Sequence, residues 1–390
     1  MTDNKKLKIG LEVSSLINHG QDIGAGRYII NLARSLLDID KINSYLLFGT
    51  HTDTRYLDLA FGLGRGLPDE RIGFRFRKVP EKCVKAQERL RFPPIEFMGF
   101  KADVFHCMDY KIPPTFNKNI VLTVHDLAFM RFPEFNFEWF IKKYSRMVAR
   151  NIANSKKVLA SSESTGRDII KFYDTEPEKV EVVHLAAGPI FKKFEPKDID
   201  KAAVSKFGIR GPYILSVGTI EPRKDFVTLI KAYNMARDKK PGPFHKLVIA
   251  GRTGWKSEAT YNEHDLSPFK EDIIFTDRIS DQELVQLYNQ ADIFVYTSLF
   301  EGFGFPPLEA MSCGLPVICT DSSSIGEVVG DAGILVGPGN TDGFADNILK
   351  VLSDGSLMER LSVNSLNRAE KFSWEETARK TLAVYRKASY

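Results

Sequence analysis

Two glutamates, Glu301 and Glu309, flank seven residues in the stretch EGFGFPPLEAMSCGLPV, residues 301–317. A carboxylate accepts hydrogen bonds and donates none, so a pair of them suits the hydroxyl groups of a ribose or a hexose. Other interpretations stay open at this point. The first alternative is a metal site, and the second is a catalytic acid and base. The third is two charges without a ligand, in which Glu301 is solvated in a loop and Glu309 compensates a helix dipole.

The residues between the two glutamates predict a loop that passes into a helix. Gly302 and Gly304 let the backbone approach a ligand closely, and the two prolines that follow suit the first turn of a helix. We expect that helix to run to about Cys313 and to stop at Gly314. The loop N–H groups and the helix N-terminus would then form an anion site.

Two adjacent cations, Arg223 and Lys224, occur in a second stretch, SVGTIEPRKDF. The strand in it is expected to end at Gly218 and a helix to begin near Asp225, so both cations lie on a loop at a strand's carboxyl end. There an arginine fork and a compact lysine charge would neutralise a diphosphate. The alternative is a solvated pair of charges beside an aspartate helix cap.

Short apolar, β-branched runs alternate with helical periods along the whole chain and would position these stretches. The predicted strands lie in residues 7–13, 44–50, 102–108, 119–126, 157–162 and 179–185, then 212–219, 245–251, 271–277, 292–298, 316–321 and 332–338. A charged segment without periodicity, 186–200, separates the two sets. The pattern predicts an α/β protein with two tandem doubly wound, Rossmann-like parallel-sheet domains facing a ligand cleft.

Length and composition agree with two globular domains. A chain of 390 residues is long for a single core, and 43% hydrophobic with 27% charged residues is ordinary. The net charge of +4 is too small to indicate nucleic acid binding. We find no signal-peptide core and no apolar run near the roughly 20 residues of a membrane span. The four scattered cysteines read as free thiols, so a cytoplasmic protein is expected.

The chain resembles retaining glycosyltransferases with the GT-B fold in three consecutive stretches, SVGTIEPRKD, SLFEGFGFPPLEAMSCGLPVICTD and SSSIGEVVGDAGILVGPGN. The E-x7-E spacing is that family's signature, and bacterial mannosyltransferase-like members that build surface polysaccharides look most similar. The resemblance implies an acceptor-binding domain at 1–190 and a domain at 191–374 that binds a nucleotide-sugar donor. A C-terminal helix at about 375–390 would pack back on the first domain.

The resemblance also implies a role for each matching residue. Glu309 would accept from the ribose hydroxyls, Glu301 from a hydroxyl of the transferred sugar, and Arg223 with Lys224 would hold the diphosphate. Neither a metal ion nor a cofactor is then required. Glu301, Arg223 and Lys224 are the predicted catalytic residues of this domain. Further donor contacts would come from Gly218, Thr219, Arg278, Phe303, Gly304 and Phe305.

The first domain resembles the family in two places. NIVLTVHDL is similar to a strand that ends in His-Asp, which places His125 beside the sugar as a fourth catalytic residue. GAGRYII is similar to the glycine loop and helix start that approach the diphosphate and acceptor, which assigns Gly24, Ala25 and Gly26 to that loop. The alternatives are a buried core histidine and a helix entry turn. Asp126 is expected to be structural.

Two D-x-D pairs, Asp38 with Asp40 and Asp198 with Asp200, match the metal-binding signature of the other large glycosyltransferase fold. The first lies at a predicted helix end and the second in the linker, so we interpret both as coincidence. The glycine loop is no dinucleotide fingerprint either, because Ile29 stands where the third glycine would be.

A basic and aromatic segment, residues 71–101, carries nine Lys or Arg against three Glu. Five phenylalanines are interleaved with these charges: Phe74, Phe76, Phe92, Phe97 and Phe100. Such a segment in the acceptor domain suits peripheral contact with an anionic membrane. The alternative is a solvated basic face with phenylalanines in the core.

Family resemblance implies transfer of a hexose with retention of its anomeric configuration to a glycan or lipid-linked oligosaccharide. The most similar members suggest mannose carried on guanosine diphosphate. We favour same-face attack, in which the departing phosphate takes the acceptor's proton, over a covalent intermediate on Glu301. Two other functions fit the same residues: a nucleotide-sugar epimerase or phosphorylase, and a non-catalytic glycan-binding protein.

Overall fold

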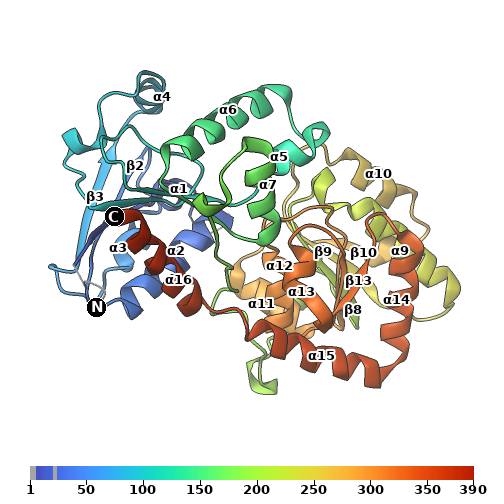
Figure 1. The fold of residues 1–390 in the computed structure, drawn as a ribbon. Helices are drawn as coiled ribbons and strands as arrows, with labels where there is room; N and C mark the ends of the chain where they lie inside the picture. The colour runs from blue at the N-terminus through green and yellow to red at the C-terminus, as the bar shows by residue number, and fades with distance from the viewer. Residues whose placement is uncertain (1–5, 21–23) are drawn as a thin grey trace. The chain divides into compact units, whose positions relative to one another are not determined.

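The computed structural model describes residues 6–20 and 24–390. The chain folds into two compact units, the first made of Met1–Leu185 with Ser373–Tyr390 and the second of Ala186–Phe372 (Figure 1). It leaves the first unit at Leu185, five residues before the boundary expected at residue 190, and returns to it at Ser373.

The first unit is built on seven parallel strands in the order β3-β2-β1-β4-β5-β6-β7. The order changes direction between β1 and β4, which are neighbours although β2 and β3 separate them in the sequence. Their bounds are β1 Lys8–Glu12, β2 Ser44–His51, β3 Ile72–Lys78, β4 Val104–Cys107, β5 Ile120–Val124, β6 Lys157–Ala160 and β7 Val180–Val182.

Alternate residues of β5 show how both faces of this sheet are covered. Leu122 and Val124 are buried in a cluster that includes Ile152 of α6. Thr123 points the other way, where its Oγ1 lies 2.9 Å from the hydroxyl of Tyr28 on α2. The described helices are α1 Ser14–His19, α2 Gly24–Ile39, α3 Leu57–Gly62, α4 Glu81–Leu90, α5 Ala128–Arg131, α6 Glu138–Asn154, α7 Glu163–Tyr173 and α16 Trp374–Ser389, with 3-10 turns η1 Ile95–Met98, η2 Pro133–Phe135 and η3 Pro177–Lys179.

The strand β3 is missing from the sequence-based prediction, which placed its residues in a surface segment. Arg75 and Arg77 alternate with Phe74 and Phe76, which is the period of a strand. The phenylalanines contact Phe61 of α3, and the two arginines are exposed. Because β3 lies at the sheet edge, it lacks the continuous apolar run of a central strand.

The second unit contains six parallel strands in the order β10-β9-β8-β11-β12-β13. All of them lie within runs predicted as strands, so the expected second doubly wound sheet is confirmed. The strands are β8 Tyr213–Val217, β9 Lys246–Ala250, β10 Ile273–Phe275, β11 Ile293–Tyr296, β12 Val317–Thr320 and β13 Ile334–Val336. The described helices are α8 Lys201–Ser205, α9 Phe226–Lys239, α10 Glu258–Leu266, α11 Asp281–Gln290, α12 Phe305–Ser312, α13 Ile325–Val329, α14 Thr341–Ser353 and α15 Gly355–Ala369, with 3-10 turns η4 Pro196–Asp198, η5 Pro222–Lys224, η6 Lys270–Asp272 and η7 Gly330–Ala332.

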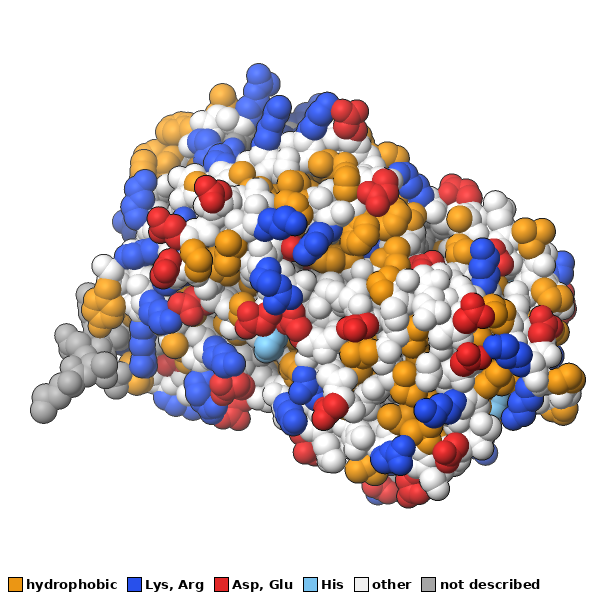
Figure 2. Space-filling model, turned by 45° about the vertical axis from the view of Figure 1, so that its right-hand side comes forward, with side chains coloured by type: hydrophobic (Ala, Val, Ile, Leu, Met, Phe, Trp, Pro, Cys, Tyr) orange, Lys and Arg blue, Asp and Glu red, His pale blue; other side chains and the backbone are white. Residues whose placement is uncertain are grey.

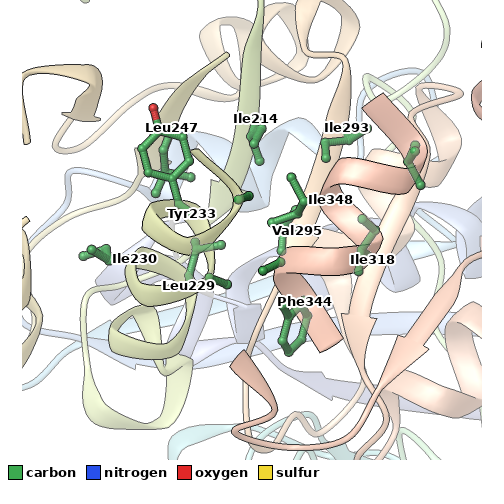
Figure 3. Packing of buried hydrophobic residues seen from close by; sticks show 14 of the residues in the cluster. Ile214, Leu229, Ile230, Tyr233, Leu247, Ile293, Val295, Ile318, Phe344 and Ile348 are labelled. Carbon is green, nitrogen blue, oxygen red and sulfur yellow. The ribbon is translucent and has the colours of Figure 1, made fainter. Parts of the chain in front are cut away.

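Two helices of the second unit, α9 and α14, cover one face of its sheet (Figure 3). Leu229 of α9 and Phe344 of α14 are fully buried with Val295 of β11. Burying an apolar side chain of this size contributes about 1.5–3 kcal/mol. The side chain of Asp225 caps α9 by accepting from the N–H of Thr228, so this packing also fixes the end of the loop that carries Arg223 and Lys224.

Across residues 6–20 and 24–390, no helix combines the length and the apolar character that crossing a bilayer requires. The cysteines at positions 83, 107, 313 and 319 are free thiols.

Candidate functional site

The order of the second sheet changes direction between β8 and β11. Open parallel sheets bind ligands at such a switch point, outside the carboxyl ends of the strands. Two loops meet there, 218–225 after β8 and 297–304 after β11. The strand ends also approach closely, because a Cβ atom at Gly251 would lie 2.0 Å from the carbonyl oxygen of Gly218.

Glu301 lies at the centre of a buried charge cluster in these loops. Its Oε1 accepts from Nζ of Lys224 at 2.6 Å and from Oγ of Ser298 at 2.6 Å. The hydroxyl of Tyr296 donates to the same oxygen at 2.8 Å. Oε2 lies 3.0 Å from Nη1 of Arg223. Glu301 is only 9% exposed, so its interpretation as a solvated loop charge is wrong.

The two cations keep Glu301 ionised. Burial alone would raise the pKa of Glu301, but the charges of Arg223 and Lys224 outweigh that effect and lower the pKa to about 2. Burial lowers the pKa of Lys224, and the charge of Glu301 opposes the shift. A carboxylate that stays ionised at neutral pH cannot act as a general acid there.

Lys224 is itself held by two partners. Besides its bond to Glu301, Nζ donates to the hydroxyl of Tyr296 at 2.7 Å. An ammonium group has three N–H donors. Among the residues that the structure describes, these two bonds leave one donor of Lys224 for a ligand.

A second acid, Glu221, joins the cluster and was not singled out from the sequence. Its Oε1 accepts from Nη2 of Arg223 at 2.6 Å, and the residue is 2% exposed. Nη1 of Arg223 also donates to the carbonyl oxygen of Phe300 at 2.6 Å. The guanidinium therefore joins the two loops, and the two acids balance the charges of Arg223 and Lys224.

Tyr296 and Ser298 are two further site residues that sequence reasoning missed. They lie two positions apart where β11 ends, so both side chains point to the same side of the strand. The carboxylate of Glu301 accepts from both hydroxyls. The signal was present in the run DIFVYTS, where two hydroxyl residues with strand spacing precede the glutamate.

The loop that begins at Glu301 leads into α12, as predicted. Gly304 is its N-cap with a φ of 106°, and α12 ends before Gly314, whose φ is 74°. The expected anion site has fewer backbone N–H donors than the sequence pattern suggested. Pro306 and Pro307 occupy the first turn and have no N–H, so α12 lacks two of its four N-terminal donors. Backbone donors for an anion remain at Gly304 and Phe305.

Glu309 lies one turn into α12 and is 1% exposed. Its Oε2 accepts from the hydroxyl of Tyr288 at 3.2 Å. The rings of Tyr288 and Tyr296 both contact the ring of Phe294, with centroids 5.7 and 5.6 Å from it. A tyrosine from one aromatic row therefore bonds each glutamate of the pair.

The other predicted donor-binding residues follow strands of the same sheet. Thr219 follows β8 and is half-buried, and Arg278 follows β10 and is exposed. Phe303 is 4% exposed, with its ring 5.6 Å from that of Phe305 and 5.9 Å from that of Phe372. The side chain of Phe303 thus belongs to the core, which leaves its backbone for any contact with a ligand.

His125 follows β5 of the first unit and is half-buried. Its Nε2 donates to the carbonyl oxygen of Met108 at 3.0 Å, and its ring meets Tyr28 edge-on at 4.9 Å. With Nε2 donating, Nδ1 is the nitrogen that accepts in the neutral ring. Asp126 accepts from the N–H of Ala128 at 3.0 Å, which is a structural role.

Gly24, Ala25 and Gly26 lie in the first turn of α2, which begins at Gly24. They therefore form the predicted helix start rather than the loop before it, and their approach to the diphosphate and acceptor stays a prediction. The remainder of the predicted loop, residues 21–23, lies outside the described residues.

One aspartate of each D-x-D pair has a structural role. Asp40 accepts from the side chains of Asn43 and Tyr45, and Asp200 caps α8. Within residues 6–20 and 24–390, no three His, Cys, Asp or Glu side chains gather closely enough to hold a metal ion.

Two family models match the chain, one in each half. The model described as Glycosyltransferase Family 4 matches residues 23–186. The model described as Glycosyl transferases group 1 matches residues 200–368.

Curated relatives include mannosyltransferases of Escherichia coli. The chain is 28% identical over 288 residues to the O-antigen chain mannosyltransferase B, a match that covers 74% of this chain and 75% of the relative. It is 29% identical over 228 residues to the serotype-specific mannosyltransferase WbdA, which covers 57% of this chain and 27% of WbdA.

Solved structures with the same fold include glycosyltransferases. Anabaena HepE in complex with UDP and glucose matches with a TM-score of 0.73 at 16% identity, over 98% of this chain and 100% of HepE. WaaG, a glycosyltransferase involved in lipopolysaccharide biosynthesis, matches with a TM-score of 0.69 at 16% identity, over 96% of this chain and 98% of WaaG. The chain therefore has the GT-B fold, with a region that matches the Glycosyltransferase Family 4 model followed by one that matches the Glycosyl transferases group 1 model.

Proposed function

We propose that this chain transfers a hexose from a nucleotide-diphosphate sugar to a hydroxyl group of a glycan or lipid-linked oligosaccharide, with retention of anomeric configuration. Mannose is the hexose we favour, because the two Escherichia coli relatives are mannosyltransferases. The complexes of HepE with UDP and with UDP-glucose support a nucleotide-sugar donor. We propose that cations of the chain, rather than a metal ion, stabilise the leaving diphosphate.

The buried cluster around Glu301 carries this proposal. Two acids and two cations in a core cost desolvation energy that apolar side chains would avoid, so a purely structural cluster gains little. This cluster lies at the carboxyl ends of β8 and β11, where parallel sheets bind ligands. Its position favours a role in binding over a role in stability.

In the proposed complex, diphosphate oxygens accept from the remaining N–H of Lys224 and from the backbone N–H groups of Gly304 and Phe305. These donors are fixed before the ligand arrives, and such preorganised donors are worth about 3 kcal/mol each in other enzymes. Glu301 accepts from a hydroxyl of the transferred sugar through a lone pair that its ion pairs leave over. Glu309 accepts from the ribose, which requires a small displacement of the residues that bury it.

The reaction breaks the bond between the anomeric carbon and the diphosphate oxygen and forms a bond from that carbon to the acceptor oxygen on the same face. The acceptor's proton passes to the departing phosphate oxygen, so no external base is needed. Negative charge grows on the leaving oxygen while Lys224 and Arg223 stay in place. The negative charge of ionised Glu301 stabilises the positive charge that develops on the sugar.

We also propose that the first unit contacts an anionic membrane through a basic aromatic surface. Its apolar part is Leu90, Phe92, Phe97 and Phe116, which are 71%, 60%, 65% and 63% exposed. Its exposed cations are Arg75, Arg77 and Lys78 of β3 with Lys82, Lys85 and Arg89 of α4. Figure 2 shows Lys and Arg side chains close to hydrophobic ones along its upper left edge. A lipid-linked acceptor at the inner face of the plasma membrane would place substrate and enzyme together.

The decisive experiment is a thermal-shift screen of the full chain over nucleotide-diphosphate sugars, followed by transfer assays with the donor that stabilises it. We expect one donor class to raise the Tm strongly and to yield a product with the donor's anomeric configuration. An inverted linkage would contradict retention, and loss of transfer in EDTA would contradict the metal-free mechanism. Epimerised sugar formed without acceptor would support an epimerase, and donor binding without any transfer would support a glycan-binding protein.

A further inference from the structure

The first unit contains a pocket of about 670 Å³ that no site described so far occupies. It opens at the carboxyl ends of three strands, next to the switch point between β1 and β4. Glu12 ends β1, His51 ends β2, and Asp109 follows β4; all three line the pocket. This is the position in the first sheet that the Glu301 cluster has in the second, and the volume lies within the roughly 300–1,000 Å³ of ligand sites.

The lining of the pocket has an apolar and a polar part. The apolar part includes Val84 of α4, Ile95 and Met98 of η1, and Phe100, while α4 also contributes Glu81 and Gln87. The polar part includes strand-end residues and the first turns of α1: Glu12, Ser14, Ser15, Asn18, Thr50, His51 and Asp109. A sugar ring has the same division, with C–H groups on its faces and hydroxyl groups around its edge.

The polar part is rich in hydrogen-bond acceptors. Asp109 accepts from Oγ of Ser15 at 2.6 Å and from the N–H of Tyr110 at 2.7 Å, and a carboxylate with these two bonds keeps lone pairs for more. Oε1 of Glu12 accepts from the N–H of Ser14 at 3.0 Å, and the side chain of Ser14 also bonds the carboxyl group of Glu12. Nδ1 of His51 is bonded to the carbonyl oxygen of Asp53, so Nε2 is the acceptor of the neutral ring.

The charges of the pocket disfavour an anion. Burial, with the charge of Asp109 and against the effects of Ser14 and Lys111, raises the pKa of Glu12 to about 7. Lys111 is the cation of the described lining. A phosphate or carboxylate in this partly buried site would be repelled by the charge of Asp109, and by that of Glu12 wherever Glu12 is ionised.

We infer that this pocket binds the acceptor's terminal sugar, and that this sugar is an uncharged hexose ring, with phosphorylated and uronic sugars excluded by Glu12 and Asp109. The inference rests on the proposed function, since it names the acceptor of that reaction. The phosphate of a lipid carrier then lies outside the pocket. Substrate choice at the acceptor side follows from two acids at the ends of β1 and β4.

The test uses the full chain without donor and measures sugar binding by saturation-transfer NMR. The neutral probes are the methyl α-glycosides of mannose, glucose and galactose, and the anionic probes are mannose 6-phosphate and glucuronate. We expect at least one neutral glycoside to bind tenfold or more tightly than either anion. Equal or tighter binding of the anions would overturn the inference.

Two variants locate the binding. Thr52 lines the pocket and is exposed at its mouth, so Thr52→Trp should weaken the neutral probe tenfold or more. Thr54→Trp, two residues away on the same exposed segment and outside the lining, is the matched control and should bind as the wild type does. Asp109→Asn should at least halve the preference for neutral over anionic sugars, with Asp69→Asn as its exposed control. Unchanged binding by Thr52→Trp would place the sugar elsewhere.

Thermal shifts with nucleotide-sugars on the same preparations separate the two proposals. If a nucleotide-sugar binds and is transferred while sugars ignore the pocket, the inference fails and the glycosyltransferase function stands. If neutral sugars bind in the pocket and no nucleotide-sugar is bound or consumed, the function fails and the pocket is a glycan-binding site.

Discussion

Nζ of Lys224 lies 2.6 Å from Oε1 of Glu301, and both groups contact the hydroxyl of Tyr296. The cation proposed to hold the diphosphate and the carboxylate proposed to hold the sugar are therefore a single buried unit. Neither group needs to change its position or its charge when a donor binds. The ion pair keeps the carboxylate ionised and keeps the lysine side chain in one conformation.

Lys224→Ala should lower kcat for transfer by about 10²- to 10³-fold, because it removes one fixed donor to the leaving diphosphate. It should also destabilise the fold by roughly 3–5 kcal/mol, since a buried Glu301 loses a partner. The measurement is steady-state kinetics together with urea unfolding. Lys231→Ala, on the exposed face of α9, is the control for lysine loss in the same unit.

A double variant separates the two effects of Lys224. Lys224→Met with Glu301→Gln removes both charges, so much of the lost stability should return while transfer stays absent. Near-wild-type transfer by Lys224→Ala would rule out the assignment of Lys224 to the diphosphate.

Removing the hydroxyl group of each tyrosine that bonds a glutamate should change a different kinetic parameter. Tyr296→Phe removes hydrogen bonds to Lys224 and Glu301, and bonds to charged groups are worth about 1.5–3 kcal/mol, so kcat should fall roughly 10- to 100-fold. Tyr288→Phe removes the bond to Glu309 and should raise the donor KM with a smaller change in kcat. The two variants are matched controls, since both rings contact Phe294. A pair of variants with identical kinetic defects would contradict separate sugar and ribose roles.

Much of the second unit was predictable from local pattern. Its strands are buried on both faces, so each is an apolar run that periodicity detects, and the glycines and prolines around α12 mark the helix ends. The pairing of Lys224 with Glu301 was not predictable in this way. These residues are 77 positions apart and meet only because β11 lies beside β8.

Local sequence also failed to predict one feature of each unit, the strand β3 in the first and the burial of Glu301 in the second. The edge strand β3 escaped prediction because its arginines face solvent, which hides the apolar period. The burial of Glu301 also escaped, since a glutamate among glycines resembles a surface loop until the cations and hydroxyls around it are known. Local sequence predicts the elements, whereas the topology decides which loops meet.

Glu12→Gln should stabilise the protein in a pH-dependent way. The pKa of Glu12 is about 7 in the fold against 4.5 as the ordinary value. Its effect on stability is therefore fully favourable below pH 4.5 and is lost as the pH rises through 7, where the unfolded chain is already ionised. At 1.36 kcal/mol per pKa unit, the variant should gain roughly 3 kcal/mol over the wild type between pH 4 and pH 8.

Urea unfolding across that pH range measures this difference. Glu138→Gln, at an exposed position of α6, is the control and should show a flat difference. A flat difference for Glu12→Gln would mean that Glu12 is not held in an anion-disfavouring pocket.

Tyr385→Phe should destabilise the first unit by about 1–3 kcal/mol, which is the cost of leaving a buried polar group without its partner. The hydroxyl of Tyr385 on α16 is 2.6 Å from Nδ1 of His106, whose Nε2 is 2.8 Å from Oγ1 of Thr123. Burial lowers the pKa of His106 to about 3, so its ring stays neutral and needs both partners. Tyr390→Phe, at an exposed position, should change the unfolding free energy by less than about 0.5 kcal/mol. Equal effects of the two variants would mean that this bond does not hold α16 on its unit.

Phe92→Ser with Phe97→Ser should reduce flotation of the full chain with vesicles that contain anionic phospholipid. The two rings are exposed and contact each other with centroids 6.1 Å apart, so they can enter a bilayer surface together. Each nearby Lys or Arg adds about 1 kcal/mol at such a surface, and Lys82→Glu with Lys85→Glu should therefore weaken flotation further than neutral substitution.

Leu266→Ser, at a position of the second unit that is 80% exposed, is the control for loss of a surface apolar group. Vesicles of zwitterionic lipid should retain little protein. Flotation that is equal for both lipids, or unchanged in the phenylalanine variant, would show that the basic aromatic surface is a solvated face.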